Sequence, residues 1–117
     1  MIKEIKVLSR SMILDYINCA KPNIETNGII LFNRDLAEQI ILFVNNLSKE
    51  IEQIWVHCYA GISRSGAVGL WATRYLELNE ELFRSKHPHI QPNETILEIL
   101  SDASGMTKKR INFWSNI

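Results

Sequence analysis

The sequence predicts an α/β fold in which a short, mostly parallel sheet is flanked by helices. Two observations predict this fold. Apolar runs of strand length alternate along the chain with longer stretches in which apolar residues recur at helical spacing. The chain also has 117 residues, of which 46% are hydrophobic and 22% charged, as expected for one globular domain spanning residues 1–117.

The first part of the chain predicts a strand followed by a helix and a loop. In residues 2–8 apolar and charged side chains alternate, which is typical of a half-buried strand. Residues 10–20 suit a helix that ends before Pro22, because the residue before a proline avoids the α-helical conformation. Residues 21–28, with the sequence KPNIETNG, are the clearest loop segment of the chain.

A helix and a buried strand are predicted next. Asn33 is a suitable N-cap for a helix over residues 34–47, whose apolar residues recur on one face. Residues 51–58 are typical of a strand. Because the last residues of this segment are apolar on both faces, we expect a central strand that is buried on both sides.

Three further helices are predicted after this strand. They are expected over residues 65–78, from Asn93 to residue 100, and over residues 107–116. The large aromatic side chains of these segments are expected to pack in the interior, namely Trp71, Phe113 and Trp114.

The overall charge excludes several classes of partner. Thirteen basic and thirteen acidic residues cancel, so no net field attracts nucleic acid or an anionic membrane. The basic run Lys108-Lys109-Arg110 is expected to be a solvated helix face. No apolar run approaches the roughly 18–20 residues of a membrane span, and the charged start is unlike a signal peptide. Two isolated cysteines, Cys19 and Cys58, indicate reduced thiols and a cytoplasmic location.

A loop of small residues joins the strand at residues 51–58 to the next helix, in the sequence IWVHCYAGISRSG from Ile54. Unpaired N–H groups of such a loop and of the helix start can converge on an anion, which the helix dipole also favours. Gly61 allows a sharp turn. The guanidinium group of Arg64 matches two oxygens of a phosphate. These residues predict a phosphate-binding loop.

Cys58 lies where the strand ends and this loop begins. A helix N-terminus and a nearby arginine favour the thiolate and lower the pKa of a cysteine. The thiolate is then a nucleophile directed at the bound phosphorus. Ser65 can donate a hydrogen bond to the sulfur as it leaves. His57 is on the opposite side of the strand, so we expect it to orient the loop rather than to act as a base.

The segment HCYAGISRSG, residues 57–66, resembles the His-Cys-x5-Arg-Ser/Thr motif of the cysteine-dependent protein tyrosine phosphatase superfamily. Its AGISRS version is most similar to the dual-specificity branch and to small microbial and viral members. Residues 30–44 resemble the helix that precedes the catalytic strand in that branch. Residues 87–100 resemble the segment in which a Pro-Asn pair, here Pro92 and Asn93, opens a helix. The resemblance covers roughly residues 29–100.

The resemblance implies hydrolysis of phosphomonoesters, on protein phosphotyrosine or on phosphoserine and phosphothreonine, through a phosphocysteine intermediate. Cys58 would be the nucleophile, with Arg64 and Ser65 as catalytic partners and Asn93 and His57 supporting the loop. The phosphate would be bound by Tyr59, Ala60, Gly61, Ile62, Ser63 and Arg64. The partner would be a phosphorylated protein or a small phosphomonoester, and no metal or organic cofactor is implied. Related loops also accept arsenate or an RNA 5′-phosphate, and the sequence does not indicate an oligomeric state.

The general acid of the family has no clear counterpart. Relatives use an aspartate on a loop upstream of the cysteine, and the corresponding segment, residues 21–28, contains none. Asp35 lies in a first helical turn, where a carboxylate complements the helix dipole, and Glu25 lies in the right loop but is another residue type. The acid is therefore Asp35, Glu25 or absent. The N-terminal half is also short for the family sheet, so a phosphate-binding module without turnover is the alternative function.

Three other residues have simpler interpretations. His87 and His89 flank Pro88 in a polar segment, so we expect both to be solvated. With no further Cys or His at ligand spacing, we expect no metal site. Cys19 is expected to be a small core residue, and a redox partnership with Cys58 is the alternative.

Overall fold

The computed structural model describes residues 1–12 and 32–106. The predictions for most of the helix at residues 10–20, for the loop at 21–28, for Cys19 and Glu25, and for everything after residue 106 lie outside the described residues. The elements are, in chain order, β1 (Glu4–Ser9), α2 (Arg34–Asn45), β2 (Gln53–Cys58), α3 (Arg64–Tyr75), α4 (Glu80–Lys86) and α5 (Glu94–Ala103). The α/β class predicted from the sequence is confirmed.

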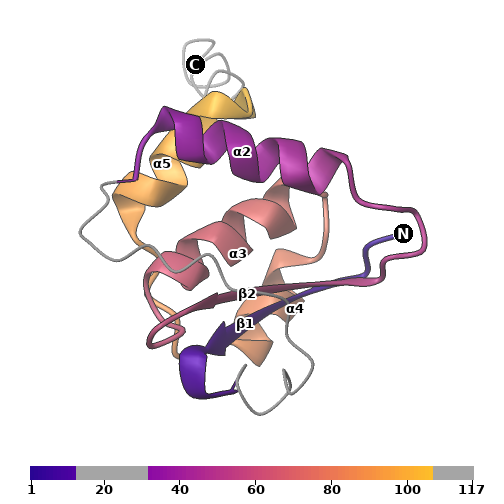
Figure 1. The fold of residues 1–117 in the computed structure, drawn as a ribbon. Coiled ribbons are helices and arrows are strands. Elements are labelled where there is room, and N and C mark those ends of the chain that lie inside the picture. The colour runs from indigo at the N-terminus through magenta and orange to yellow at the C-terminus, as the bar shows by residue number, and fades with distance from the viewer. Residues whose placement is uncertain (13–31, 107–117) are drawn as a thin grey trace, which may run out of the picture.

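The two strands pair in parallel, with Glu4 opposite Gln53 at one end and Ser9 opposite Cys58 at the other. Ile5 and Val7 of β1 and Ile54 of β2 are buried in the core. Figure 1 shows α3 lying along the sheet, with α2 and α5 on its far side. Within the described residues no helix is long and apolar enough to cross a membrane.

The helix α3 is the centre of the core because nearly all of its faces are buried. Its residues Ala67, Leu70 and Trp71 are almost fully inaccessible to solvent, and it packs on both strands, on α4 and on α5. The Trp71 indole N–H donates to the Ser104 hydroxyl over 3.0 Å, and its ring stacks on Tyr75 with centroids 4.8 Å apart. The predicted interior position of Trp71 is confirmed.

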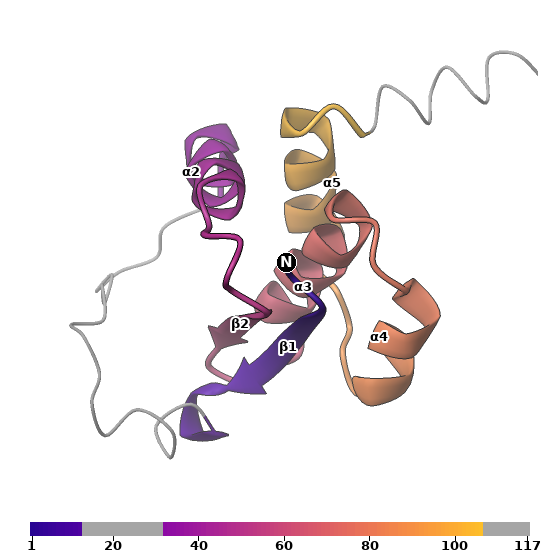
Figure 2. The same ribbon diagram turned by 90° about the vertical axis from the view of Figure 1, so that its right-hand side faces the viewer.

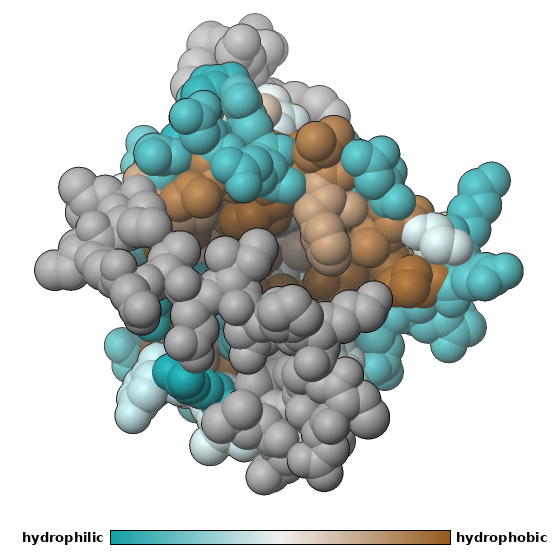
Figure 3. Space-filling model, in the orientation of Figure 1, coloured by the Kyte–Doolittle hydropathy of each residue, from teal (hydrophilic) through white to brown (hydrophobic). Residues whose placement is uncertain are grey.

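The predicted start of α2 is confirmed, because the Asn33 side chain accepts a hydrogen bond from the Leu36 N–H over 3.0 Å. Ala37 and Val44 of this helix are buried. Figure 3 shows apolar surface gathered across the middle of the face seen in Figure 1. Two apolar residues on the other side of α2 are exposed, Leu42 and Phe43.

The short helix α4 is absent from the sequence prediction. Its start is marked by Asn79, whose side chain accepts from the Leu82 N–H, and by Glu80 and Glu81 in the first turn. With seven residues and only Phe83 buried, it carries too little helical periodicity to be recognised, although its capping residues are favourable. Figure 2 shows β1 between β2 and α4.

The prediction that the strand ending at Cys58 is buried on both faces is wrong for the described residues. Along β2 buried or half-buried residues alternate with exposed ones. Ile54 is buried, whereas Trp55 is 39% exposed and His57 is also exposed. The strand therefore has one face on the core and one open face. Trp55 belongs to the apolar run but lies on the open face. Its neighbour on β1 is Lys6, whose Nζ atom lies 5.9 Å from the centroid of the Trp55 ring.

Candidate functional site around Cys58

Cys58 is the last residue of β2, and its side chain points to the same face of the sheet as Ile54. The backbone N–H of Gly61 donates to the Cys58 sulfur over 3.3 Å. The Ser65 hydroxyl lies 3.1 Å from the same sulfur. Residues Cys58 to Ser65, which we call the Cys58 loop, thus fold back so that several donors surround one half-buried sulfur atom.

These donors control the pKa of Cys58. Burial of the thiol raises its pKa, but the Ser65 hydroxyl and the backbone N–H groups of Ser65, Gly61 and Ile62 lower it by more. The net result lowers the pKa from 9.0 to about 7. A large fraction of Cys58 is therefore thiolate at neutral pH, which makes it a better nucleophile than an ordinary cysteine.

Gly61 is required by the geometry of the Cys58 loop. Its φ angle is +71°, a conformation that side chains disfavour. A Cβ atom at this position would lie 2.7 Å from the Ser9 nitrogen and 2.8 Å from the Leu8 carbonyl carbon. The loop therefore packs directly on the backbone at the end of β1, and no other residue type fits there.

Backbone hydrogen bonds hold the rest of the loop. The Arg10 N–H donates to the Tyr59 carbonyl over 3.1 Å. The N–H groups of Gln91 and Asn93 donate to the carbonyls of Ile62 and Ser63, both over 3.0 Å. Asn93 thus contacts the loop through its backbone, while its side chain accepts from the Ile96 N–H and caps α5. The predicted opening of a helix at this position is confirmed.

Polar and exposed side chains lie along the Cys58 loop and at the start of α3, which follows it. Ser63 is the N-cap residue of α3, but its side chain makes no capping hydrogen bond. Arg64, the first residue of the helix, is exposed and has no hydrogen bond or ion pair with any described residue. Tyr59 is 73% exposed and Ile62 is 37% exposed, and Ala60 is exposed as well. These side chains form the open rim of the loop.

The structure does not connect the two other predicted site residues to this loop. Asp35 is exposed in the first turn of α2, where no hydrogen bond or ion pair joins it to a described residue. His57 is exposed on the open face of β2, and its side chain likewise makes no hydrogen bond within the described part of the chain. No carboxylate among the described residues is hydrogen-bonded or ion-paired to the Cys58 loop.

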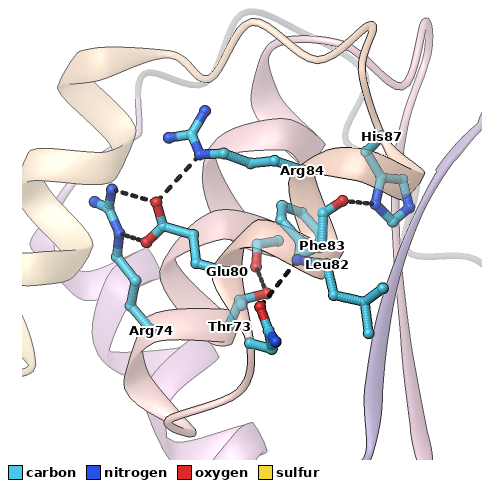
Figure 4. A network of polar contacts seen from close by, with 9 residues as sticks. Thr73, Arg74, Glu80, Leu82, Phe83, Arg84 and His87 are labelled. Carbon is cyan, nitrogen blue, oxygen red and sulfur yellow. Dashed lines mark hydrogen bonds and ion pairs between the residues drawn. The ribbon is translucent and has the colours of Figure 1, made fainter.

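The expectation that His87 is solvated is wrong. His87 is only 8% exposed, and its Nε2 atom accepts a hydrogen bond from the Val7 N–H over 3.1 Å. Its Nδ1 atom lies 2.9 Å from the Phe83 carbonyl, as Figure 4 shows. His87 is the C-cap residue of α4, and its imidazole accepts from a backbone N–H at the outer edge of β1. His89, in contrast, is exposed as expected.

Charged residues of α3 and α4 form a separate network. Glu80 accepts from Arg74 over 2.6 Å and from Arg84 over 3.1 Å (Figure 4). The hydrogen bond from Arg74 is the main cause that lowers the pKa of Glu80. Lys86 pairs with Glu4 over 2.8 Å, which likewise lowers the pKa of Glu4. The first set of ion pairs joins α3 to α4 and the second joins α4 to β1, and neither involves the Cys58 loop.

Comparison of the chain with family models, with curated proteins and with solved structures finds no match. Within residues 1–12 and 32–106, no group of three or more His, Cys, Asp or Glu side chains is placed to hold a metal ion. The functional interpretation therefore depends on the geometry around Cys58.

Proposed function

We propose that this protein is a cysteine-dependent phosphatase that hydrolyses phosphomonoesters through a phosphocysteine intermediate. The observation that carries the proposal is the convergence of the Gly61 N–H and the Ser65 hydroxyl on the Cys58 sulfur. Arg64, the first residue of the adjoining helix, is exposed and makes no hydrogen bond or ion pair with any described residue. Donors that lower the pKa of a sulfur to about 7 also suit a phosphate bound above it.

The proposed reaction has two steps. The Cys58 thiolate attacks phosphorus, an S–P bond forms, and the bond from phosphorus to the leaving oxygen breaks. Water then attacks the phosphocysteine, which releases inorganic phosphate and restores the thiolate. The loop N–H groups and the Arg64 guanidinium would stabilise the equatorial oxygens, and the Ser65 hydroxyl would stabilise the departing sulfur. This chemistry uses no metal or organic cofactor.

We propose phosphorylated proteins, with phosphotyrosine first and phosphoserine or phosphothreonine next, as the substrate class, and small phosphomonoesters as substitutes. A cytoplasmic location would suit the reaction, because a reducing environment keeps a reactive thiol from oxidising.

A phosphate-binding module without turnover is the second candidate function. It is favoured by one observation, which is that no described carboxylate is hydrogen-bonded or ion-paired to the Cys58 loop. Without a general acid, an alkyl leaving group would depart as a poorly stabilised alkoxide. The intact nucleophile favours the enzyme.

Hydrolysis of p-nitrophenyl phosphate between about pH 5 and about pH 8 tests the proposal, with Cys58→Ser as the control. An aryl leaving group partly removes the need for an acid. Turnover that depends on Cys58 would establish the enzyme, and loss of one limb of a bell-shaped profile in Asp35→Asn would identify the acid. Binding of vanadate without turnover would instead establish the binding module.

A further inference from the structure

We propose that His87, in its neutral form, is a positioning residue for the Cys58 loop. Its hydrogen bond fixes β1 between α4 and the loop, and β1 in turn holds the loop in place. The functional meaning of this role rests on the proposed function. The coupling itself depends only on hydrogen bonds and packing among the described residues.

The hydrogen bonds of His87 define its protonation state. A backbone N–H can only donate, so the Nε2 atom that accepts from Val7 carries no proton. The proton of the neutral imidazole is then on Nδ1, where it donates to the Phe83 carbonyl. The ring is buried and lies 4.6 Å from the ring of Phe83. Protonation would place two donors, Nε2–H and the Val7 N–H, against each other.

The strand β1 connects His87 to the sulfur. Val7, which donates to His87, precedes Leu8 and Ser9, the residues that pack on Gly61. The Gly61 N–H in turn donates to the Cys58 sulfur. On its other side β1 is fitted closely to α3, because a Cβ at Gly69 would lie 2.6 Å from the Val7 Cγ2 atom. A shift of β1 at Val7 would therefore be transmitted within two residues to the loop.

The charged groups around His87 are paired with one another. On the elements packed against it, Glu4 of β1 pairs with Lys6 and with Lys86 of α4, and Glu80 of α4 pairs with Arg84 and with Arg74 of α3. His89, whose ring centroid is 6.4 Å from that of His87, is outside these pairs. A protonated His87 would be attracted to Glu4, but this carboxylate is already paired with Lys86 and Lys6. The side chains of these ion pairs are partly or largely exposed to solvent, whereas the contact between His87 and Val7 is buried.

The proposal predicts that Cys58 and His87 gain and lose protons together. Loss of the His87 proton tightens the loop, the tight loop favours the thiolate, and the thiolate in turn favours neutral His87. The thiolate titration should then be steeper than that of a single group. A direct charge attraction between an imidazolium and a thiolate would have the opposite sign, because it makes the titration shallower.

The first test is the ultraviolet titration of the Cys58 thiolate, with the matching Cys58→Ser protein subtracted at each pH. We expect a steep curve for the natural protein and for His89→Gln, whose substituted residue is exposed. His87→Gln, which keeps an acceptor but does not titrate, should give a single-site curve with about threefold more thiolate on the acid side. Equal slopes in the two glutamine variants, or a shallow natural curve, would overturn the proposal.

A second measurement applies even if His87→Gln fails to fold. The imidazole resonances of His87 can be titrated by NMR in the natural protein and in Cys58→Ser. We expect the His87 midpoint to move to higher pH when the thiolate is removed, and no movement for His89. An unchanged midpoint, or one that moves to lower pH, would contradict the positioning role. Neither measurement requires turnover, so failure of phosphatase activity and failure of this inference are separate results.

Discussion

The Cys58 loop and the contact between α4 and β1 are both rich in polar groups, but their polar groups face different partners. At the α4–β1 contact polar groups are paired with one another within the protein, as in the pairs Lys86–Glu4 and Val7–His87. In the Cys58 loop the hydrogen-bond donors surround one sulfur atom, and Arg64 makes no hydrogen bond or ion pair with any described residue. The first arrangement stabilises the fold, whereas the second is the arrangement that the proposed function requires.

Removing one arginine from each region tests most directly whether the two regions differ in role. Arg64→Ala should lower kcat/KM for p-nitrophenyl phosphate by about 1,000-fold, because the guanidinium would stabilise the charge of the transition state. Its free energy of unfolding should change by less than about 0.5 kcal/mol.

Arg84→Ala is the matched control, because Arg84 is also exposed but pairs with Glu80 over 3.1 Å. We expect a loss of about 0.5 kcal/mol in the free energy of unfolding and unchanged kcat/KM. Equal losses of activity in the two variants would show that the regions do not differ in role.

A second comparison, between two glycines, separates the cost of a steric collision with the backbone from the cost of a positive φ angle. Gly61 and Gly105 both have positive φ angles, but a Cβ would collide with backbone only at Gly61. Gly61→Ala should therefore lower the free energy of unfolding by at least about 3 kcal/mol, against about 1 kcal/mol for Gly105→Ala. Urea denaturation measures both values. Similar losses of unfolding free energy in the two variants would mean that the β1 backbone shifts at little cost to accommodate a Cβ at residue 61.

A third prediction concerns the pH dependence of stability. Because folding lowers the pKa of Cys58 from 9.0 to about 7, the stabilisation is fully present above about pH 9 and is lost as the pH falls through 7. The difference in unfolding free energy between the natural protein and Cys58→Ser should grow over this range. Two pKa units correspond to roughly 2.7 kcal/mol, and solvent screening of the half-buried thiol reduces the expected gain to about 1 kcal/mol.

Denaturation under reducing conditions at several pH values measures this gain. A constant difference across the range would contradict the role of the loop donors.

The smallest expected effect lies at the surface of the α4–β1 contact. Lys86→Ala removes the nearer of the two lysine partners of Glu4, so the pKa of Glu4 should rise toward its ordinary value. The free energy of unfolding should fall by only about 0.5 kcal/mol, since the Lys86 side chain is 49% exposed and that of Glu4 is 25% exposed. NMR titration of Glu4 and thermal unfolding provide the two readouts. A loss of several kcal/mol would show that this ion pair, rather than the buried His87, holds the contact together.

Features fixed by neighbouring residues could be predicted from the sequence. Asn33 and Asn93 cap their helices as their residue type suggests, because a capping hydrogen bond spans only three residues. The turn at Gly61 could also be predicted from local sequence, because the Gly61 N–H and the Cys58 sulfur to which it donates lie within one short segment. The residues of the loop are therefore sufficient by themselves to indicate a candidate site.

Features that depend on distant residues could not be predicted. The burial of His87 follows from its hydrogen bond to Val7, which lies 80 positions earlier in the chain. The open face of β2 depends on which elements cover the sheet, and the apolar character of Trp55 gives no information on that. The backbone contact of Asn93 with Ser63 likewise carries no side-chain signal.

The parallel pairing of β1 with β2 has a consequence for the order of folding. Glu4 meets Gln53, and the loop carbonyls of Ile62 and Ser63 meet the N–H groups of Gln91 and Asn93. The surroundings of the sulfur thus combine three stretches of chain that emerge from the ribosome at widely separated times. Closing such long loops slows folding. Cys58 should therefore keep the reactivity of an ordinary thiol during synthesis, and acquire its low pKa only when the segment around residue 93 has joined the fold.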